Sequence, residues 1–160
     1  MTKIFVSGGS GSGKTTYAKQ LSNQYNIPHF DLDDIYWITY GTNRSKKERS
    51  IQLEHILSSN PSWVIEGVYS SAWIEPIINQ CDKIVIINPP TWRRQYRIIK
   101  RYIKNKFSNQ NTEHNETITS ISKLLCWAQR YEPEYLPELL TRIKNAGKLY
   151  TIITNNKNIR

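Results

Sequence analysis

The chain has 160 residues, of which 38% are hydrophobic and 22% charged, a composition that excludes a disordered protein and fits one globular domain over residues 1–160. Its 22 Lys and Arg residues outnumber its 13 Asp and Glu residues, and the net charge of +9 favours anionic partners such as phosphates or nucleic acid. Apolar runs such as residues 84–87 are far too short to span a membrane, and no signal peptide is visible. We therefore expect a cytoplasmic protein without a membrane partner.

Short apolar runs alternate with helical patterns along the whole chain. In chain order the patterns predict a strand at 3–7, a helix at 14–25, a strand at 28–30, a helix at 45–58, a strand at 63–66, a helix at 73–80, a strand at 83–88, a helix at 92–106, a helical region at 116–146 interrupted near Pro133 and Pro137, and a strand at 149–153. Strands that alternate with helices favour a parallel sheet with right-handed crossovers. The predicted fold is α/β, with a five-stranded parallel sheet between two layers of helices.

A glycine-rich segment follows the first predicted strand and fits the phosphate-binding pattern G-x-x-x-x-G-K-[ST]. Glycines let successive backbone N–H groups point at an anion, and the helix that follows adds the positive end of its dipole. Lys14 is expected to reach the β- and γ-phosphates, and the Thr15 hydroxyl is expected to bind Mg²⁺. The predicted nucleotide-binding residues are Gly8, Gly9, Ser10, Gly11, Ser12, Gly13, Lys14, Thr15 and Thr16. The expected cofactors are ATP and Mg²⁺.

Two large classes of phosphate-loop protein do not fit the sequence. A GTPase needs Asn-Lys-x-Asp to read the base, and the nearest match, at residues 156–159, lacks the Asp. Many ATPase motors carry an acidic residue after an apolar strand, and here that strand ends in Asn88. The small kinases remain as the class that fits this sequence best.

Acidic residues follow the second and third predicted strands. Asp31, Asp33 and Asp34 come after one strand and Glu66 after the other, so both groups are expected near the phosphate loop. A carboxylate there can orient metal-bound water or accept a hydroxyl proton during phosphoryl transfer. We expect Asp33 to organise Mg²⁺ together with Thr15, and Glu66 or Asp33 to orient the acceptor. Asp31 and Asp34 have the simpler interpretation of helix caps.

The positive charge is concentrated in residues 83–112, which hold eight basic residues and no acidic one. Three interpretations compete: arginines that neutralise a transferring phosphoryl group, a surface for nucleic acid, and a solvated amphipathic helix. In the third, an apolar stripe lies on the protein side of the helix. The stripe consists of Trp92, Tyr96, Ile99 and Ile103. We favour Arg97 and Arg101 as catalytic groups that face the phosphate, with the other basic residues of the helix in solvent.

Two further segments are candidates for contacts with substrates. The Asn-rich residues 105–116 predict a lid that closes over ATP and excludes water. Aromatic residues gather after the second and third strands, where an acceptor would lie, and could stack on a ring. These aromatic residues are Tyr36, Trp37, Tyr40 and Tyr69.

The chain resembles the adenylate-kinase-related P-loop proteins known as DNA topology-modulation proteins. The stretches that carry the resemblance are residues 4–16, 33–37, 63–70 and 90–101. The resemblance implies a nucleoside-monophosphate-kinase-like fold with strand order 2-3-1-4-5. It also implies binding of ATP and Mg²⁺ and a kinase activity whose acceptor is poorly defined.

The match to that family is incomplete at three positions. Asp33 matches the family's acidic residue after the second strand, whereas Glu66 stands where the family usually has Asp. Asn88 stands where the family often has Asp, and Pro76 or its neighbours stand where the family often has Arg in the helix after Tyr69. These departures leave open any metal role of the strand that ends at Asn88 and the way in which the acceptor is held.

Two functions therefore compete at the level of sequence. The first is a kinase that transfers the γ-phosphoryl group of Mg-ATP to a nucleotide, a nucleoside or another small acceptor. The second is a nucleotide-dependent protein that binds nucleic acid through its basic helix. Acidic and aromatic residues facing a phosphate loop are needed only by the kinase, so Asp33 and Glu66 favour the first function. Nucleic acid remains a possible partner that we do not favour.

Overall fold

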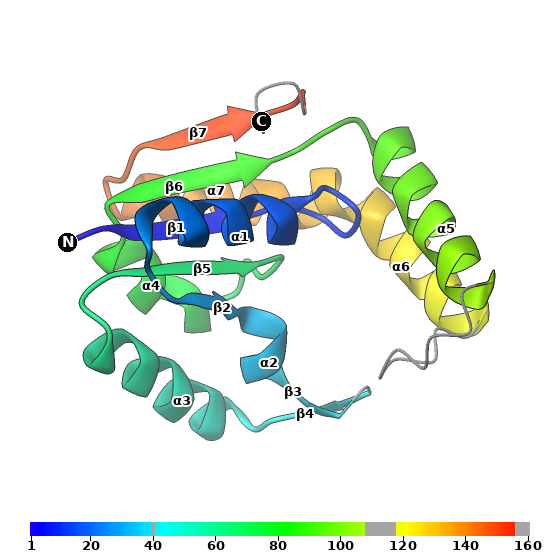
Figure 1. Cartoon of the computed structure of the whole chain (residues 1–160). Helices are drawn as coiled ribbons and strands as arrows, with labels where there is room; N and C mark the ends of the chain where they lie inside the picture. Colours follow the sequence, from blue (N-terminus) through cyan, green and yellow to red (C-terminus); the bar gives the residue numbers. More distant parts are fainter. Residues whose placement is uncertain (40, 108–117, 156–160) are drawn as a thin grey trace.

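The computed structural model describes residues 1–39, 41–107 and 118–155 (Figure 1). Its central feature is a five-stranded sheet in the order β2–β5–β1–β6–β7, and every neighbouring pair is parallel. The strands are β1 (Lys3–Ser7), β2 (His29–Asp31), β5 (Trp63–Gly67), β6 (Lys83–Ile87) and β7 (Tyr150–Ile153). Counted within this sheet alone, the strands follow the order 2-3-1-4-5, so the predicted α/β fold and its topology are confirmed.

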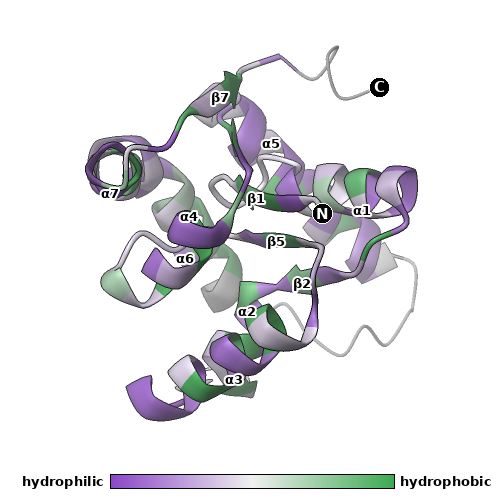
Figure 2. Cartoon of the chain, turned by 90° about the vertical axis from the view of Figure 1, so that its left-hand side faces the viewer, coloured by the Kyte–Doolittle hydropathy of each residue, from purple (hydrophilic) through white to green (hydrophobic). Residues whose placement is uncertain are grey.

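Helices cover both faces of the sheet because the central strands direct apolar side chains toward both faces. Ile4 and Val6 of β1 pack with Leu21 of α1 (Lys14–Tyr25) on one face. Phe5, between them, packs on the other face with Ile77 and Ile143, from α4 (Glu75–Gln80) and α7 (Leu136–Asn145). Figure 2 shows the strands lying between α1 on one side and α4 and α7 on the other. The three predicted layers are present.

A short region between β2 and α3 (Lys46–Ser59) was not predicted from the sequence. It contains the helix α2 (Leu32–Tyr36) and a two-stranded hairpin of β3 (Trp37–Thr39) and β4 (Thr42–Asn43). The guanidinium of Arg44 donates to the carbonyl oxygens of Asp34 and Trp37, which joins the end of the hairpin to α2. This region extends from the carboxyl end of β2, where an acceptor is expected.

The last helical region is interrupted once, near one of its two prolines. Helix α6 (Ile118–Arg130) leads into a π-helical turn, η2 (Tyr131–Tyr135), and then into α7. Pro133 lies within η2, as expected for a residue that cannot donate a backbone hydrogen bond. Pro137 lies in the first turn of α7, where proline is tolerated. The short helix η1 (Ala72–Ile74) precedes α4, and its Ile74 packs in the same core cluster as Ile77 of α4 and Ile143 of α7.

Helix α5 (Thr91–Phe107) packs against α6 beyond the carboxyl ends of the strands (Figure 1). The face that it buries differs from the predicted one. Ile98 is buried with Ile121 and Ala128 of α6, and Arg94 on the same face is fully buried. The predicted apolar stripe is exposed instead, because α6 lies on the opposite side of the helix. Its members are Trp92, Tyr96, Ile99 and Ile103.

Two other sequence-based expectations concern membranes and the lid. Within the described ranges, no helix is both long enough and apolar enough to cross a membrane. Of the predicted lid, residues 105–107 belong to α5, while residues 108–116 lie outside the described residues.

Candidate functional site

The phosphate loop connects β1 to α1 at the carboxyl edge of the sheet. Its backbone turns back on itself, since the Ser12 N–H donates to the carbonyl oxygen of Gly9 at 3.0 Å. Gly11 and Gly13 have φ values of 76° and 97°, in the left-handed region that favours glycine. The glycines of the motif are therefore required by the path of the backbone, as the sequence pattern predicts.

Surrounding elements leave no room for a side chain at three glycines of this loop, Gly8, Gly9 and Gly11. A Cβ atom on Gly8 would lie 2.6 Å from the Ile87 carbonyl oxygen, and one on Gly9 would lie 2.9 Å from the Tyr131 ring. A Cβ atom on Gly11 would collide with the Arg94 carbonyl group. The loop is therefore fixed between β6, η2 and α5. This rigid glycine backbone before the N-terminus of α1 fits the polyphosphate of a nucleotide.

Glu66 ends β5 as a fully buried carboxylate beside the phosphate loop. Its Oε2 atom lies 3.4 Å from the Lys14 ammonium, and its Oε1 atom lies 3.8 Å from His29 Nε2. Burial alone would raise the pKa of Glu66, but His29, Lys14 and the Thr15 hydroxyl outweigh burial and lower the pKa to about 2. Glu66 is therefore an anion that faces Lys14, the lysine predicted to bind phosphate.

Asp31 lies directly beside Glu66, since the two residues are register partners in the parallel pairing of β2 with β5. Burial, and then the charge of Glu66, raise the pKa of Asp31 to about 7. One carboxyl group of such a pair ionises easily and the other is harder to ionise. The predicted capping role is also present, because the Asp33 N–H donates to Asp31 Oδ1 at 2.9 Å. The pairing of Asp31 with Glu66 had a signal in the sequence, because each acid stands at the end of a predicted strand.

Asp33 is exposed and faces a group of aromatic side chains. The Tyr69 hydroxyl donates to Asp33 Oδ1 at 2.7 Å, and burial together with Asp33 raises the pKa of Tyr69. The Tyr69 ring stacks on Tyr36 with centroids 4.8 Å apart and meets the edge of Trp73 at 5.1 Å. The structure thus joins Asp31, rather than Asp33, to Glu66 and Lys14. Asp33 belongs to the side of the site where an acceptor is expected.

Arg49 of α3 completes this aromatic group, and sequence reasoning missed it. Its guanidinium is buried, 4.5 Å from the centroid of the Tyr36 ring and 5.6 Å from that of Trp73. Its side-chain hydrogen bond goes to a backbone acceptor, the Ser45 carbonyl oxygen, at 3.5 Å. Among the described residues no carboxylate forms an ion pair with it. A buried cation held by aromatic faces can bind an anionic group of a ligand.

Arg97 of α5 lies at the phosphate loop, and its predicted role toward a phosphate stays a prediction. Its Nη1 group donates to the Ser12 carbonyl oxygen at 2.8 Å and to that of Gly11 at 3.4 Å. Burial, and then the neighbouring charge of Arg93, lower the pKa of Arg97. Arg101 is exposed on the next turn of the same helix.

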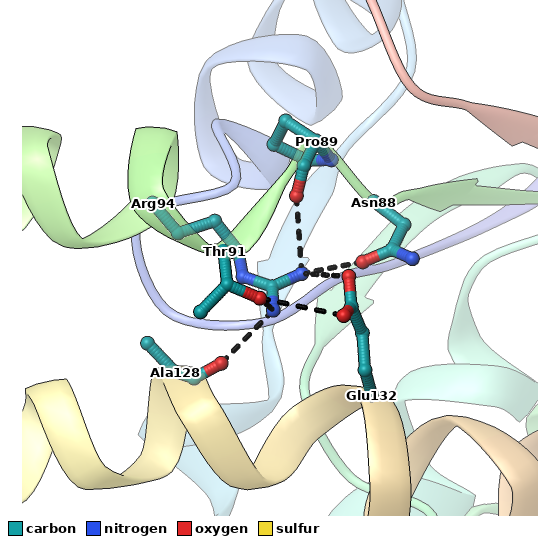
Figure 3. A network of polar contacts seen from close by, with 6 residues as sticks. All are labelled: Asn88, Pro89, Thr91, Arg94, Ala128 and Glu132. Carbon is teal, nitrogen blue, oxygen red and sulfur yellow. Dashed lines mark hydrogen bonds and ion pairs between the residues drawn. The ribbon is translucent and has the colours of Figure 1, made fainter.

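Arg94 is not in solvent, which corrects the expectation from its place in the basic helix. Its guanidinium is fully buried among hydrogen-bond acceptors from three segments of the chain (Figure 3). The acceptors are Asn88 Oδ1, the Pro89 carbonyl oxygen at 3.2 Å, Thr91 Oγ1 at 2.9 Å, the Ala128 carbonyl oxygen at 2.9 Å and Glu132 Oε1 at 3.4 Å. The charge is stabilised by this network and could not be recognised from helical periodicity.

The network also gives Asn88 a role. Its amide oxygen accepts a hydrogen bond from Arg94, which links the end of β6 to α5. Through Ala128 and Glu132 the same guanidinium links α5 to α6 and η2. Tyr131 of η2 and the Arg94 carbonyl group form two walls of the phosphate loop, at the positions that Cβ atoms on Gly9 and Gly11 would meet. Arg94 belongs to one wall and contacts the other, since its guanidinium lies 5.4 Å from the centroid of the Tyr131 ring.

The side chains beside the phosphate loop suit Mg²⁺ that is bound together with a nucleotide. Within the described residues, no group of three or more His, Cys, Asp or Glu side chains could hold a metal ion. Magnesium in phosphoryl-transfer sites is typically bound by one or two protein groups together with phosphate oxygens and water. Thr15 and Asp31, both next to Glu66, could supply such groups.

The chain has a P-loop kinase fold, as comparison with solved structures shows. It is similar to shikimate kinase from Acinetobacter baumannii in complex with shikimate, with a TM-score of 0.61, 18% identity, and coverage of 97% of this chain and 84% of that one. It is also similar to shikimate kinase from Bacteroides thetaiotaomicron, with a TM-score of 0.58, 17% identity, and coverage of 96% and 86%. At such identities the similarity establishes the fold and not the acceptor.

Sequence comparisons are less specific. No family model matches the chain. The uncharacterized protein YqaC of Bacillus subtilis (strain 168) is 26% identical over 130 residues, which cover 81% of this chain and 72% of YqaC. The resemblance to DNA topology-modulation proteins is not confirmed by these comparisons, whereas the kinase-like fold that it implies is confirmed.

Proposed function

We propose that this protein is a small-molecule kinase that transfers the γ-phosphoryl group of Mg-ATP to a hydroxyl or phosphate acceptor. The observation that carries the proposal is the ion pair of Lys14, in the phosphate loop, with the buried Glu66 carboxylate, which has Asp31 as its register partner on the neighbouring strand. A phosphate-binding lysine, an ionised carboxylate and a second acid together suit phosphoryl transfer. A protein that only binds a nucleotide needs no such acidic pair.

The roles of the residues follow from their positions. Thr15 and Asp31 would hold Mg²⁺, which would supply positive charge to neutralise the charge that develops on the transferred group. Lys14 and the loop N–H groups bind the phosphates. Arg97, already beside the loop, neutralises phosphoryl charge, with Arg101 as the predicted second arginine. Asp33, exposed beside Tyr69, orients the acceptor and accepts its proton.

The acceptor is proposed to carry an anionic group and an apolar ring. Arg49 supplies a buried positive charge that a chain of contacts connects to Asp33. Arg49 lies over the Tyr36 ring, Tyr36 stacks on Tyr69, and the Tyr69 hydroxyl donates to Asp33. The rings offer flat apolar faces, and a carboxylate or phosphate would pair with the guanidinium. Nucleoside monophosphates and cyclic hydroxy acids both meet these requirements.

The test is an acceptor screen with purified full-length protein and Mg-ATP. The panel holds nucleosides, nucleoside monophosphates, cyclic hydroxy acids and their uncharged analogues, and ADP release is measured with each. We expect acceptor-dependent ADP release with an anionic ring compound and none with its uncharged analogue. Lys14→Ala should abolish the release. ATP binding without any acceptor-dependent turnover across the panel would overturn the kinase proposal and favour nucleotide-dependent binding of nucleic acid.

A further inference from the structure

The outer face of α5 carries a row of large apolar side chains that nothing in the described chain covers. The exposed fraction of these residues ranges from 43% to 64%. The four residues, here called the α5 seam, are Trp92, Tyr96, Ile99 and Ile103. Helix α5 packs on α6 through its opposite side, where Ile98 is buried. Helix α5 lies at one edge of the molecule in Figure 1, and the seam is on the side of this helix opposite the face that packs on α6.

The spacing of the seam is that of a helix that pairs with another helix. Its members are four, three and four residues apart, which is the alternation of the a and d positions of a coiled coil. A stripe confined to these positions is narrower than the apolar face of a helix that lies on a lipid surface. The seam continues for three turns and is ended by Lys106, which occupies the next position of the pattern.

The charges beside the seam identify the kind of helix that fits it. Arg93 and Lys100 lie along one flank, while Gln95 and Tyr102 lie along the other. Helix α5 as a whole contains seven basic residues and no acidic one. Two copies of this helix would repel each other, so a second copy of the chain is a poor partner. A partner helix with acidic residues beside its own apolar stripe would instead be attracted to α5.

We propose that the α5 seam binds an amphipathic helix of a partner protein, with apolar residues at a and d positions and Glu or Asp beside them. The partner's apolar residues pack between Trp92, Tyr96, Ile99 and Ile103 as knobs into holes. Its acidic residues face Arg93 and Lys100, which selects the partner and its orientation. The proposal does not depend on the proposed kinase activity, because the seam lies on the face of α5 opposite its packed side.

The experiment uses two synthetic helical peptides as probes and the full-length protein. Both peptides carry leucine at a and d positions, one has glutamate and the other lysine at the flanking positions, and each is labelled for fluorescence anisotropy. We expect saturable binding of the glutamate peptide, and at least about tenfold weaker binding of the lysine peptide. Ile99→Gln should weaken binding of the glutamate peptide at least about tenfold. Ile51→Gln, at a similarly exposed isoleucine on α3, should leave the affinity unchanged.

Specific outcomes overturn the proposal. Equal binding of both peptides, no binding of either, or unchanged binding by Ile99→Gln would each do so. For the same variants we would also measure binding to phosphatidylglycerol vesicles, binding to single-stranded DNA, and self-association by sedimentation velocity. The proposal is also overturned if the glutamate peptide does not bind and Ile99→Gln instead removes binding to vesicles, binding to DNA or self-association. The α5 seam would then be the surface for that interaction. Circular dichroism checks that each variant is folded, and Ile103→Gln serves as the second seam variant.

Discussion

The ammonium group of Lys14 lies 3.4 Å from the Glu66 carboxylate, which is fully buried. The lysine that is predicted to bind phosphate thus also compensates an acidic charge inside the protein. Removing one member of such a pair leaves the other buried without its counter-charge, which is costly. The pair therefore connects the stability of the fold to the chemistry of the proposed site.

Replacing Lys14 alone should destabilise the protein, and replacing both partners should restore part of the stability. We expect Lys14→Met to lower the free energy of unfolding by about 3 kcal/mol, because Glu66 remains buried without the ammonium. The double variant Lys14→Met with Glu66→Gln should recover at least half of that loss, while ADP release stays absent in both. Urea unfolding measures the stabilities. A double variant no more stable than Lys14→Met would contradict an ion pair at this position.

The stability of the protein should fall as the pH rises through neutrality because of Asp31. The pKa of this residue is raised to about 7, so the folded protein holds a proton that the unfolded chain releases near pH 4. The stability from this proton is complete below about pH 4 and is lost as the pH rises through about 7. After allowance for solvent screening we expect a loss of about 2 kcal/mol.

Asp31→Asn is the variant that isolates this effect. It cannot ionise, so its unfolding free energy should lack the decline between about pH 4 and pH 8. Thermal unfolding at closely spaced pH values measures the difference, and Asp34→Asn, an exposed acid of the same segment, is the control. The interpretation fails if the wild type and Asp31→Asn keep parallel pH profiles over this range.

The phosphate loop and the order of the strands could be predicted because they depend on local patterns. Gly11 and Gly13 stand where the backbone itself demands glycine, and the apolar residues 84–87 mark a strand covered on both faces. The short helix α2 and its hairpin could not be predicted in this way. They are very short, and they are held by contacts that form only in the fold. Leu32 and Ile35 of α2 are buried in the core, Asp31 accepts from the Asp33 N–H, and Arg44 donates to backbone carbonyl groups.

The two faces of α5 show why the rest of the site could not be read from the sequence. Its most regular apolar pattern is exposed, and its buried face contains a charged residue, Arg94. Periodicity reports that a helix is amphipathic but not which side meets the protein. That choice depends on acceptors such as Asn88 and Ala128, which lie on other elements and come together only in the fold.

Arg49 should determine the affinity for the acceptor rather than that for ATP. Its guanidinium lies over Tyr36 on the acceptor side, while Lys14 and the loop bind the nucleotide. We expect Arg49→Met to raise KM for the anionic acceptor at least about tenfold, corresponding to one lost charged hydrogen bond, with KM for ATP changed less than about twofold. Lys46→Gln, an exposed residue of the same helix, is the matched control. Equal increases in both KM values would show that Arg49 supports the fold generally.

Arg94 should contribute to both the stability of the protein and the shape of the phosphate loop. Arg94→Met removes the donor of a buried network and leaves the acceptors on Asn88, Thr91 and Ala128 without their partner, which should cost about 3 kcal/mol of unfolding free energy. The walls against Gly9 and Gly11 then loosen, so KM for ATP should rise while KM for the acceptor changes little.

Two comparisons separate these effects of Arg94. Arg94→Lys keeps the charge but loses the planar fork, so it should recover only part of the stability and of the ATP affinity. Lys100→Gln, an exposed basic residue of the same helix, should match the wild type in both. Unfolding in urea and the KM for ATP, measured at a temperature where every variant is folded, provide the test. If Arg94→Met has the wild-type KM for ATP, the Arg94 guanidinium stabilises the packing of α5 on α6 and does not shape the phosphate loop.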